Sequence, residues 1–216
     1  MNNNLTEIVF ILDRSGSMAG LEDDTIGGFN SMVEKQKKEE GEALFSAVLF
    51  SDGSEVLYDR VDVKKIEPMT ERQYQVGGCT ALLDAIGGAV RHIANVHKYA
   101  REEDRPAKTV FVITTDGMEN ASRSYSYDEV RRMVKRQQEE SGWEFLFLGA
   151  NMDAISAARS FGIRADRAVR YQCDGEGTAL NYRVLSGAVS NIRRHREIEP
   201  EWSRPIAEDY SKRSGR

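Results

Sequence analysis

Short runs of branched apolar residues recur along the chain, separated by polar segments and turn residues. The clearest is the unbroken Ile-Val-Phe-Ile-Leu run at residues 8–12, and similar runs follow at 43–50, 109–115, 145–148 and, more weakly, 168–172. Continuous apolar runs of this length are typical of strands that are buried on both faces. Residues 55–58 follow the turn Asp52-Gly53-Ser54 and alternate less strictly, which predicts an antiparallel strand at the edge of the sheet.

Between these runs, apolar residues recur at three- and four-residue steps, which is the spacing of one face of an α-helix. The longest such stretch begins at Leu82 and ends near Val96, and others lie after Ser17, at 127–140, at 153–161 and at 180–192. Strands that alternate with helices predict an α/β fold of the doubly wound type, with a mostly parallel sheet and helices on both faces.

Composition narrows the class of protein without changing this prediction. The chain has 216 residues, of which 30% are charged, and a mean hydropathy of -0.54, which fits one soluble α/β domain. No apolar stretch approaches the roughly 18 residues of a membrane-spanning helix, and the N-terminal segment lacks the features of a signal peptide. Since the chain has only two cysteines and a net charge of -5, we expect a reduced, cytoplasmic protein that binds neither membranes nor nucleic acid.

Oxygen-bearing side chains follow the first predicted strand directly, in the segment Asp13-Arg14-Ser15-Gly16-Ser17. In an open α/β sheet, ligands bind at the carboxyl ends of the strands, where this segment is expected to lie. Carboxylate and hydroxyl oxygens are hard donors that suit Mg²⁺ or Mn²⁺ better than zinc or copper. The alternative is a Ser/Gly-rich turn that caps the following helix, and the segment by itself does not decide between the two.

Two further loops add oxygen donors where the same edge of the sheet is expected. Thr80 follows the Gly-Gly-Cys tripeptide 77–79 at the start of the long helix, where it serves either as a ligand or as a helix cap. Asp116 directly follows a later apolar run, as Asp13 follows the first. If these two strands are neighbours, both carboxylates face one crevice, and a divalent cation relieves their mutual repulsion.

The set Asp13-x-Ser15-x-Ser17, Thr80 and Asp116 resembles the metal-ion-dependent adhesion site of the von Willebrand factor A domain, which uses DxSxS, Thr and Asp in this order. The resemblance covers roughly residues 5–195 and fills all five motif positions. It implies a Rossmann-like sheet with one antiparallel edge strand and one Mg²⁺ (or Mn²⁺) at its top. Ser15, Ser17 and Thr80 would supply hydroxyl ligands, and Asp13 and Asp116 would bind the ion directly or through water.

The resemblance also implies a partner, because in this family a carboxylate from another protein often completes the octahedron around the metal. A site of mostly neutral hydroxyls leaves the cation under-neutralised, which favours an incoming Asp or Glu side chain. We therefore expect a metal-dependent protein-protein interaction domain rather than an enzyme. The alternatives are a scaffold in which the metal is only structural, and a metal-dependent hydrolase or phosphatase that uses Asp13 and Asp116.

The groups expected of an enzyme are missing from these loops. His92, His97 and His195 lie on predicted helices away from them, so we interpret them as solvated or packing residues. The chain has no Gly-x-x-x-x-Gly-Lys-Ser/Thr segment, which argues against nucleotide hydrolysis. The basic clusters at 131–136 and 193–196 are interpreted as a salt-bridged helix face and a helix C-terminus rather than as a nucleic-acid surface.

Three remaining features qualify this picture. Residues 196–216 are polar, lie outside the resemblance and predict a frayed tail or docking segment after a domain that spans 5–195. Cys173 is expected near the top of the sheet, by the last strand. Because that strand is expected at the sheet edge, away from the central metal, no disulfide is predicted. Met118 and Glu119 are expected to rim the crevice, where an exposed methionine serves either as a partner contact or as a packing residue.

Overall fold

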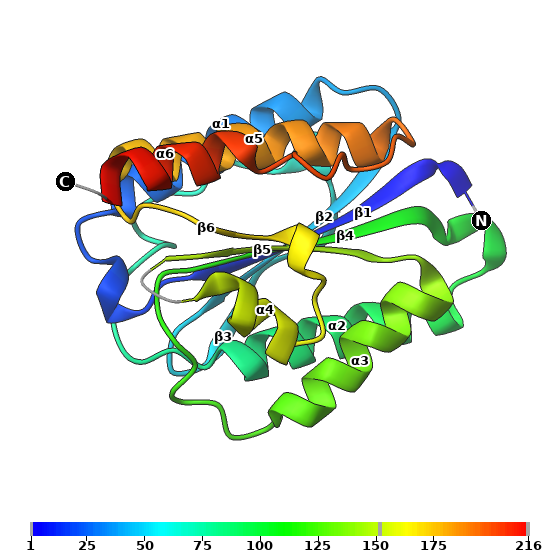
Figure 1. The fold of residues 1–216 in the computed structure, drawn as a ribbon. Helices are drawn as coiled ribbons and strands as arrows, with labels where there is room; N and C mark the ends of the chain where they lie inside the picture. The colour runs from blue at the N-terminus through cyan, green and yellow to red at the C-terminus, as the bar shows by residue number, and fades with distance from the viewer. Residues whose placement is uncertain (1, 151–152, 215–216) are drawn as a thin grey trace.

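The computed structural model describes residues 2–150 and 153–214. Within this part of the chain, six strands form one sheet in the order β3-β2-β1-β4-β5-β6, and every neighbouring pair is parallel except β2 and β3 (Figure 1). The strands are β1 Asn2–Asp13, β2 Glu42–Phe50, β3 Ser54–Asp62, β4 Pro106–Thr115, β5 Glu144–Gly149 and β6 Ala168–Arg170. The predicted α/β sheet with one antiparallel edge strand is confirmed.

Helices cover both faces of this sheet. One face carries α1 Glu22–Lys37, α5 Gly175–Arg193 and α6 Arg204–Ser214, and the other carries α2 Leu82–Tyr99, α3 Tyr127–Ser141 and α4 Ala154–Ser160 (Figure 1). Ile8, Phe10 and Leu12 of β1 belong to the core beneath α1 and α5, whereas Val9 and Ile11 belong to the core beneath α2 and α3. Successive residues of a strand point to opposite faces, so the apolar run of β1 serves both cores. None of the described helices has the length and apolar character needed to cross a membrane.

The direction in which the sheet grows reverses between β1 and β4. From β1 the sheet continues to β2 and β3 on one side, and from β4 it continues to β5 and β6 on the other. Leu12 of β1 pairs with Thr114 of β4, so Asp13 and Asp116 leave adjacent strands at the same end. At such a switch point the loops diverge and leave a crevice in which ligands bind. The condition under which both carboxylates face one crevice, that these two strands are neighbours, is therefore met.

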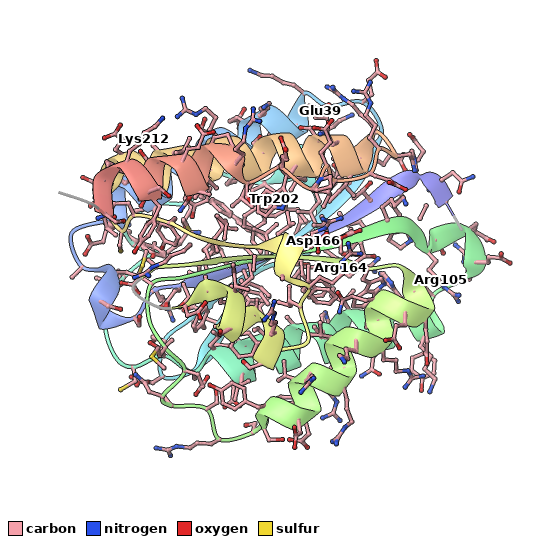
Figure 2. All side chains as sticks on the ribbon, in the orientation of Figure 1. Glu39, Arg105, Arg164, Asp166, Trp202 and Lys212 are labelled. Atoms are coloured by element: carbon pink, nitrogen blue, oxygen red, sulfur yellow. The ribbon has the colours of Figure 1, made fainter. Side chains whose placement is uncertain are left out.

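The C-terminal segment forms a packed helix, which corrects the prediction of a frayed tail. Ile206 is buried, and the indole N–H of Trp202 donates to the Asp166 carbonyl at 2.9 Å (Figure 2). The Arg170 guanidinium lies over the Tyr210 ring, 4.6 Å from its centroid, and ties α6 to β6. The sequence gives little sign of this helix because its buried stripe is narrow and its other residues are mostly polar, so the helical periodicity is weak.

The packing of α6 predicts that it unfolds together with the rest of the domain. Ile206→Val removes one buried methyl group and is expected to lower the free energy of unfolding by about 1 kcal/mol, with a single transition retained. Urea unfolding followed by circular dichroism measures this change. The exposed neighbour variant Ala207→Ser is the control, expected within about 0.5 kcal/mol of wild type. Equal stability of Ile206→Val and wild type would show that α6 does not contribute to the fold.

Candidate metal centre

The five residues predicted as ligands meet at the carboxyl ends of β1 and β4. Ser15 Oγ lies 3.1 Å from Ser17 Oγ, and Ser17 Oγ donates to Asp116 Oδ1 at 2.6 Å. Thr80 reaches the same place, since a Cβ built on Gly117 would lie 3.2 Å from Thr80 Oγ1 and 3.6 Å from Ser17 Oγ. The fold thus brings together hydroxyls and a carboxylate from three loops that are far apart in the sequence.

Asp13 is held in place by both strands. Its Oδ1 accepts a hydrogen bond from Ser15 N at 2.7 Å, and its Oδ2 accepts one from Thr115 Oγ1 at 2.6 Å. The Tyr74 hydroxyl donates to the Asp13 carbonyl from the loop before α2. Sequence reasoning missed both supporting side chains. The position of Thr115 beside Asp13 was predictable from the parallel pairing of their strands. No local sequence pattern predicts the contact of Tyr74.

The backbone joins the first loop to the second. Gly16 N donates to the Gly78 carbonyl at 3.0 Å, and Gly77 N donates to the Arg14 carbonyl at 2.9 Å. Gly78 has a φ of 78°, and a Cβ there would lie 2.2 Å from a carboxylate oxygen of Asp52. The positive φ favours glycine, and a side chain at this position would also have to displace the Asp52 carboxylate.

The second loop is joined to the third by a pair of reciprocal hydrogen bonds. Thr80 N donates to Asn120 Oδ1 at 2.9 Å, and Asn120 N donates to the Thr80 carbonyl at 3.1 Å. Next to them, Glu119 Oε2 accepts from Leu83 N at 2.8 Å in the first turn of α2. The start of α2 is therefore capped by the third loop, which fixes the position of that loop against the site.

The alternative of helix-capping hydroxyls does not agree with this arrangement. The residue at the N-cap of α2 is Ala81 rather than Thr80, and the residue at the N-cap of α1 is Leu21. Ser15 occupies the N-cap of a short 3-10 turn, Gly16–Met18, but its side chain makes no capping bond there. The hydroxyls of Ser15 and Ser17 therefore bond within the site, and that of Thr80 lies beside Gly117, instead of completing helix ends.

The two carboxylates of the site have no positive charge among their hydrogen-bonding partners in the protein. Asp13 and Asp116 are each only 2% exposed, and burial raises the pKa of both carboxyl groups above the ordinary value. The charge of Asp116 adds to the rise in the pKa of Asp13. Within the described residues, the two side chains bond to hydroxyls, a backbone N–H and a thiol, with no cationic side chain among these partners. This donor set fits a small, hard divalent cation.

Cys173 lies closer to the site than the sequence predicts. Its Sγ is 3.9 Å from Asp116 Oδ2, whereas we expected it at the sheet edge away from the metal. The strand before it, β6, is indeed the edge strand, but the chain then turns back toward the centre of the sheet to begin α5 at Gly175. Neither cysteine forms a disulfide, and Cys79 is exposed.

The centre differs from metal sites that are built of many charged ligands. In residues 2–150 and 153–214, no three or more His, Cys, Asp or Glu side chains are grouped so as to hold a metal ion. The candidate centre has two carboxylates and otherwise depends on hydroxyl oxygens. A divalent cation in such a site would take its negative charge from these two carboxylates alone, and its other protein ligands would be neutral.

The third loop is anchored by Asp84, which gives a testable prediction. Its carboxylate accepts from the backbone N–H groups of Arg123, Ser124 and Tyr125, each at 2.9 Å. Asp84→Ala removes these bonds and is expected to cost about 1–2 kcal/mol of local stability. Amide hydrogen exchange at 123–125 then accelerates roughly tenfold or more. Asp84→Asn, which keeps one acceptor oxygen, should show a smaller effect, and unchanged exchange in Asp84→Ala would contradict the anchoring role.

Comparison with known proteins identifies the fold of the chain through solved structures of low sequence identity. No protein-family model and no curated protein matches the chain. Solved structures do match. One is proximal thread matrix protein 1 from the mussel byssus, with a zinc-occupied MIDAS motif, at a TM-score of 0.59 and 16% identity over 88% of this chain and 47% of that one. MIDAS is the abbreviation for the metal-ion-dependent adhesion site.

Two further structures carry the von Willebrand factor A designation by name. The von Willebrand factor type A protein from Catenulispora acidiphila matches with a TM-score of 0.55 and 15% identity over 88% of this chain and 43% of that one. The ArnB paralog VWA2 from Sulfolobus acidocaldarius matches with a TM-score of 0.52 and 19% identity over 88% of this chain and 45% of that one. The chain spans less than half of each of these three structures. At these identities the likeness establishes a shared von Willebrand factor A fold.

Proposed function

We propose that this chain is a metal-dependent protein-interaction domain. Mg²⁺ or Mn²⁺, held by Asp13, Ser15, Ser17, Thr80 and Asp116, binds an Asp or Glu side chain of a partner protein. The observation that carries the proposal is the meeting of three hydroxyls with two buried, repelling carboxylates at the switch point of the sheet. The zinc-occupied MIDAS motif of the mussel protein supports a divalent cation in this fold.

Each residue of the centre has a distinct part in this proposal. A bound cation would supply the positive charge that attracts a partner carboxylate. Ser15, Ser17 and Thr80 offer hydroxyl lone pairs, because a hydroxyl group both donates and accepts. Thr115 and the Ser15 N–H fix the orientation of Asp13, and Ser17 fixes that of Asp116. Hydroxyl and carboxylate oxygens favour Mg²⁺ or Mn²⁺ over softer metals.

Binding is favoured over catalysis because the histidines are engaged elsewhere. His92 bonds to Asp59 at 2.8 Å, His97 bonds to Glu7 at 3.1 Å, and His195 bonds to a backbone carbonyl. A general acid or base must lie within hydrogen-bonding reach of the reacting atom. None of the three histidines is therefore placed to serve the hydrolase alternative as a proton-transfer group at the centre.

A thermal-shift titration of metal-stripped protein tests the proposal. A ligand that binds only the folded state at 100 times its Kd adds about 2.7 kcal/mol, which corresponds to about 5–10 °C for a domain of this size. We expect saturable shifts with Mg²⁺ and Mn²⁺. Thr80→Val, which has the same shape without the hydroxyl, is expected to bind roughly tenfold more weakly. The absence of any shift in the wild type would contradict the proposal.

A further inference from the structure

A small apolar cavity opens beside the candidate metal centre. Its volume is about 290 Å³, and it lies between the loop after β4, the starts of α2 and α3, and α4. The lining residues that matter here are Leu82, Met118, Tyr127, Ala157 and Phe161. The rings of Tyr127 and Phe161 stack with centroids 5.7 Å apart, and Phe161 is buried, so this wall is firmly packed.

The cavity is close to the metal-binding residues along the chain and in space. Gly117 rests against the hydroxyls of Thr80 and Ser17, and the next residue, Met118, borders the cavity. Leu82 lies two positions after Thr80 on the other side. Consecutive Cα atoms are about 3.8 Å apart. A partner chain whose side chain is bound at the centre can therefore reach the mouth of the cavity within a few residues.

Exposed apolar residues are concentrated around this cavity. The large hydrophobic side chains that are exposed in the described part of the chain are Val56, Tyr99, Met118, Tyr127 and Ile155. Three of these five border the cavity or lie on α4 beside it, and Met118 is 70% exposed. Clustering of exposed apolar surface next to a ligand site is typical of an interaction surface.

The polar groups at the rim already have partners within the chain. The Glu119 carboxylate accepts from Leu83 N, Ala121 N and Ser122 N. The Asp153 carboxylate accepts from the backbone and the hydroxyl of Ser156. The interior of the cavity therefore offers apolar surface to a partner side chain. The charged groups at the rim, Glu119 and Asp153, are both carboxylates, which disfavour a second acidic side chain there.

We infer that the cavity receives a large apolar side chain from the same partner segment whose Asp or Glu binds the metal. The partner motif is an acidic residue with Leu, Ile, Met or Phe within about three positions, since an extended chain advances about 3.3 Å per residue. The inference rests on the proposed function and states in addition which partners the site selects. The carboxylate supplies metal dependence, and the apolar residue supplies selection among acidic partners.

A peptide array tests the inference. The probes are synthetic peptides with a central Asp in a Gly/Ser background, in which one flanking position at a time is Leu, Ser or Lys. In Mn²⁺, wild type is expected to bind the best Leu peptide at least tenfold more tightly than the matching Ser peptide. Ala157→Leu fills the cavity, and Met118→Ser removes its rim; both are expected to bring this ratio close to one.

Control measurements separate failure of the cavity from failure of the metal centre. Both variants should keep the wild-type Mn²⁺ thermal shift, and Val56→Ser, which removes an exposed apolar side chain on distant β3, should keep the Leu preference. Equal binding of Leu and Ser peptides to metal-loaded wild type overturns the inference while the proposed function stands. A missing Mn²⁺ shift in wild type overturns the proposed function and this inference with it.

Discussion

Asp116→Asn is expected to abolish the metal-induced thermal shift and, at the same time, to stabilise the metal-free protein at neutral pH. The asparagine oxygen still accepts the hydrogen bond from Ser17, but the second buried negative charge beside Asp13 is gone. Loss of a ligand should weaken metal binding by ~100-fold or more, at least the upper end of what changes around a metal site cost. The two effects have opposite signs, which a general loss of structure cannot produce.

The pH dependence of the metal-free protein follows from the same carboxyl groups. Burial raises the pKa of Asp13 and of Asp116 above the ordinary value of 3.8, so the folded state holds protons that the unfolded chain has released. The contribution of these groups to stability is full below 3.8 and is lost as the pH rises through their raised folded pKa values. Asp116→Asn should therefore lose less stability than wild type on going from pH 4 to pH 7, about the range in which such groups titrate.

Urea unfolding in EDTA across this pH range, followed by Mg²⁺ titration at neutral pH, measures both effects. Asp59→Asn is the matched control because Asp59 is an exposed aspartate that pairs with His92 far from the centre. It should keep the metal response of wild type. A metal-free Asp116→Asn protein that is less stable than wild type at neutral pH would show that the carboxylates do not repel enough to matter.

Glu7→Ala is expected to lower the free energy of unfolding by about 3 kcal/mol, the cost of leaving a buried ion pair broken. Glu7 is fully buried on β1, and both of its oxygens accept from Arg60 Nε, at 2.9 and 3.2 Å. His97 Nε2 lies 3.1 Å from the same carboxylate. Arg60 has a positive φ of 51°, an uncommon conformation for a side-chain-bearing residue, where β3 bulges against β2. Alanine would leave Arg60 and His97 without this acceptor.

Urea unfolding of two further variants provides the comparison for the free energy of unfolding of Glu7→Ala: the neutral isostere Glu7→Gln and the surface variant Glu71→Ala. Glu7→Gln keeps the shape and one acceptor oxygen and should lose less stability than Glu7→Ala. The exposed Glu71→Ala should stay within about 0.5 kcal/mol of wild type. Because Glu7 lies in the middle of β1 and Asp13 at its end, the metal-induced shift should survive in all three variants. A loss below about 1 kcal/mol in Glu7→Ala would mean that Arg60 and His97 find other partners or water.

Much of the fold and of the candidate centre was predictable because it follows from local patterns of apolar and polar residues in the sequence. The apolar run 8–12 and the helical spacing from Leu82 indicate which faces of these elements are buried. They predict the elements because a strand or helix forms where its apolar face can be buried. Asp13 and Asp116 directly follow such runs, so finding the strands also located the two carboxylates. Parallel strands end at one edge of a sheet, which made their meeting a reasonable prediction before the strand order was known.

Other features depend on contacts that no local pattern records. The Glu7 carboxylate joins β1, β3 and α2, and a single acidic residue in a strand looks the same whether it faces water or Arg60. Cys173 reaches Asp116 because the chain returns from the sheet edge, and α6 is held by a few apolar residues on surfaces that other elements build. The cavity beside the centre likewise exists only where α2, α3, α4 and the loop after β4 meet. Sequence periodicity reports the burial of each element, whereas tertiary structure decides which buried or exposed groups become neighbours.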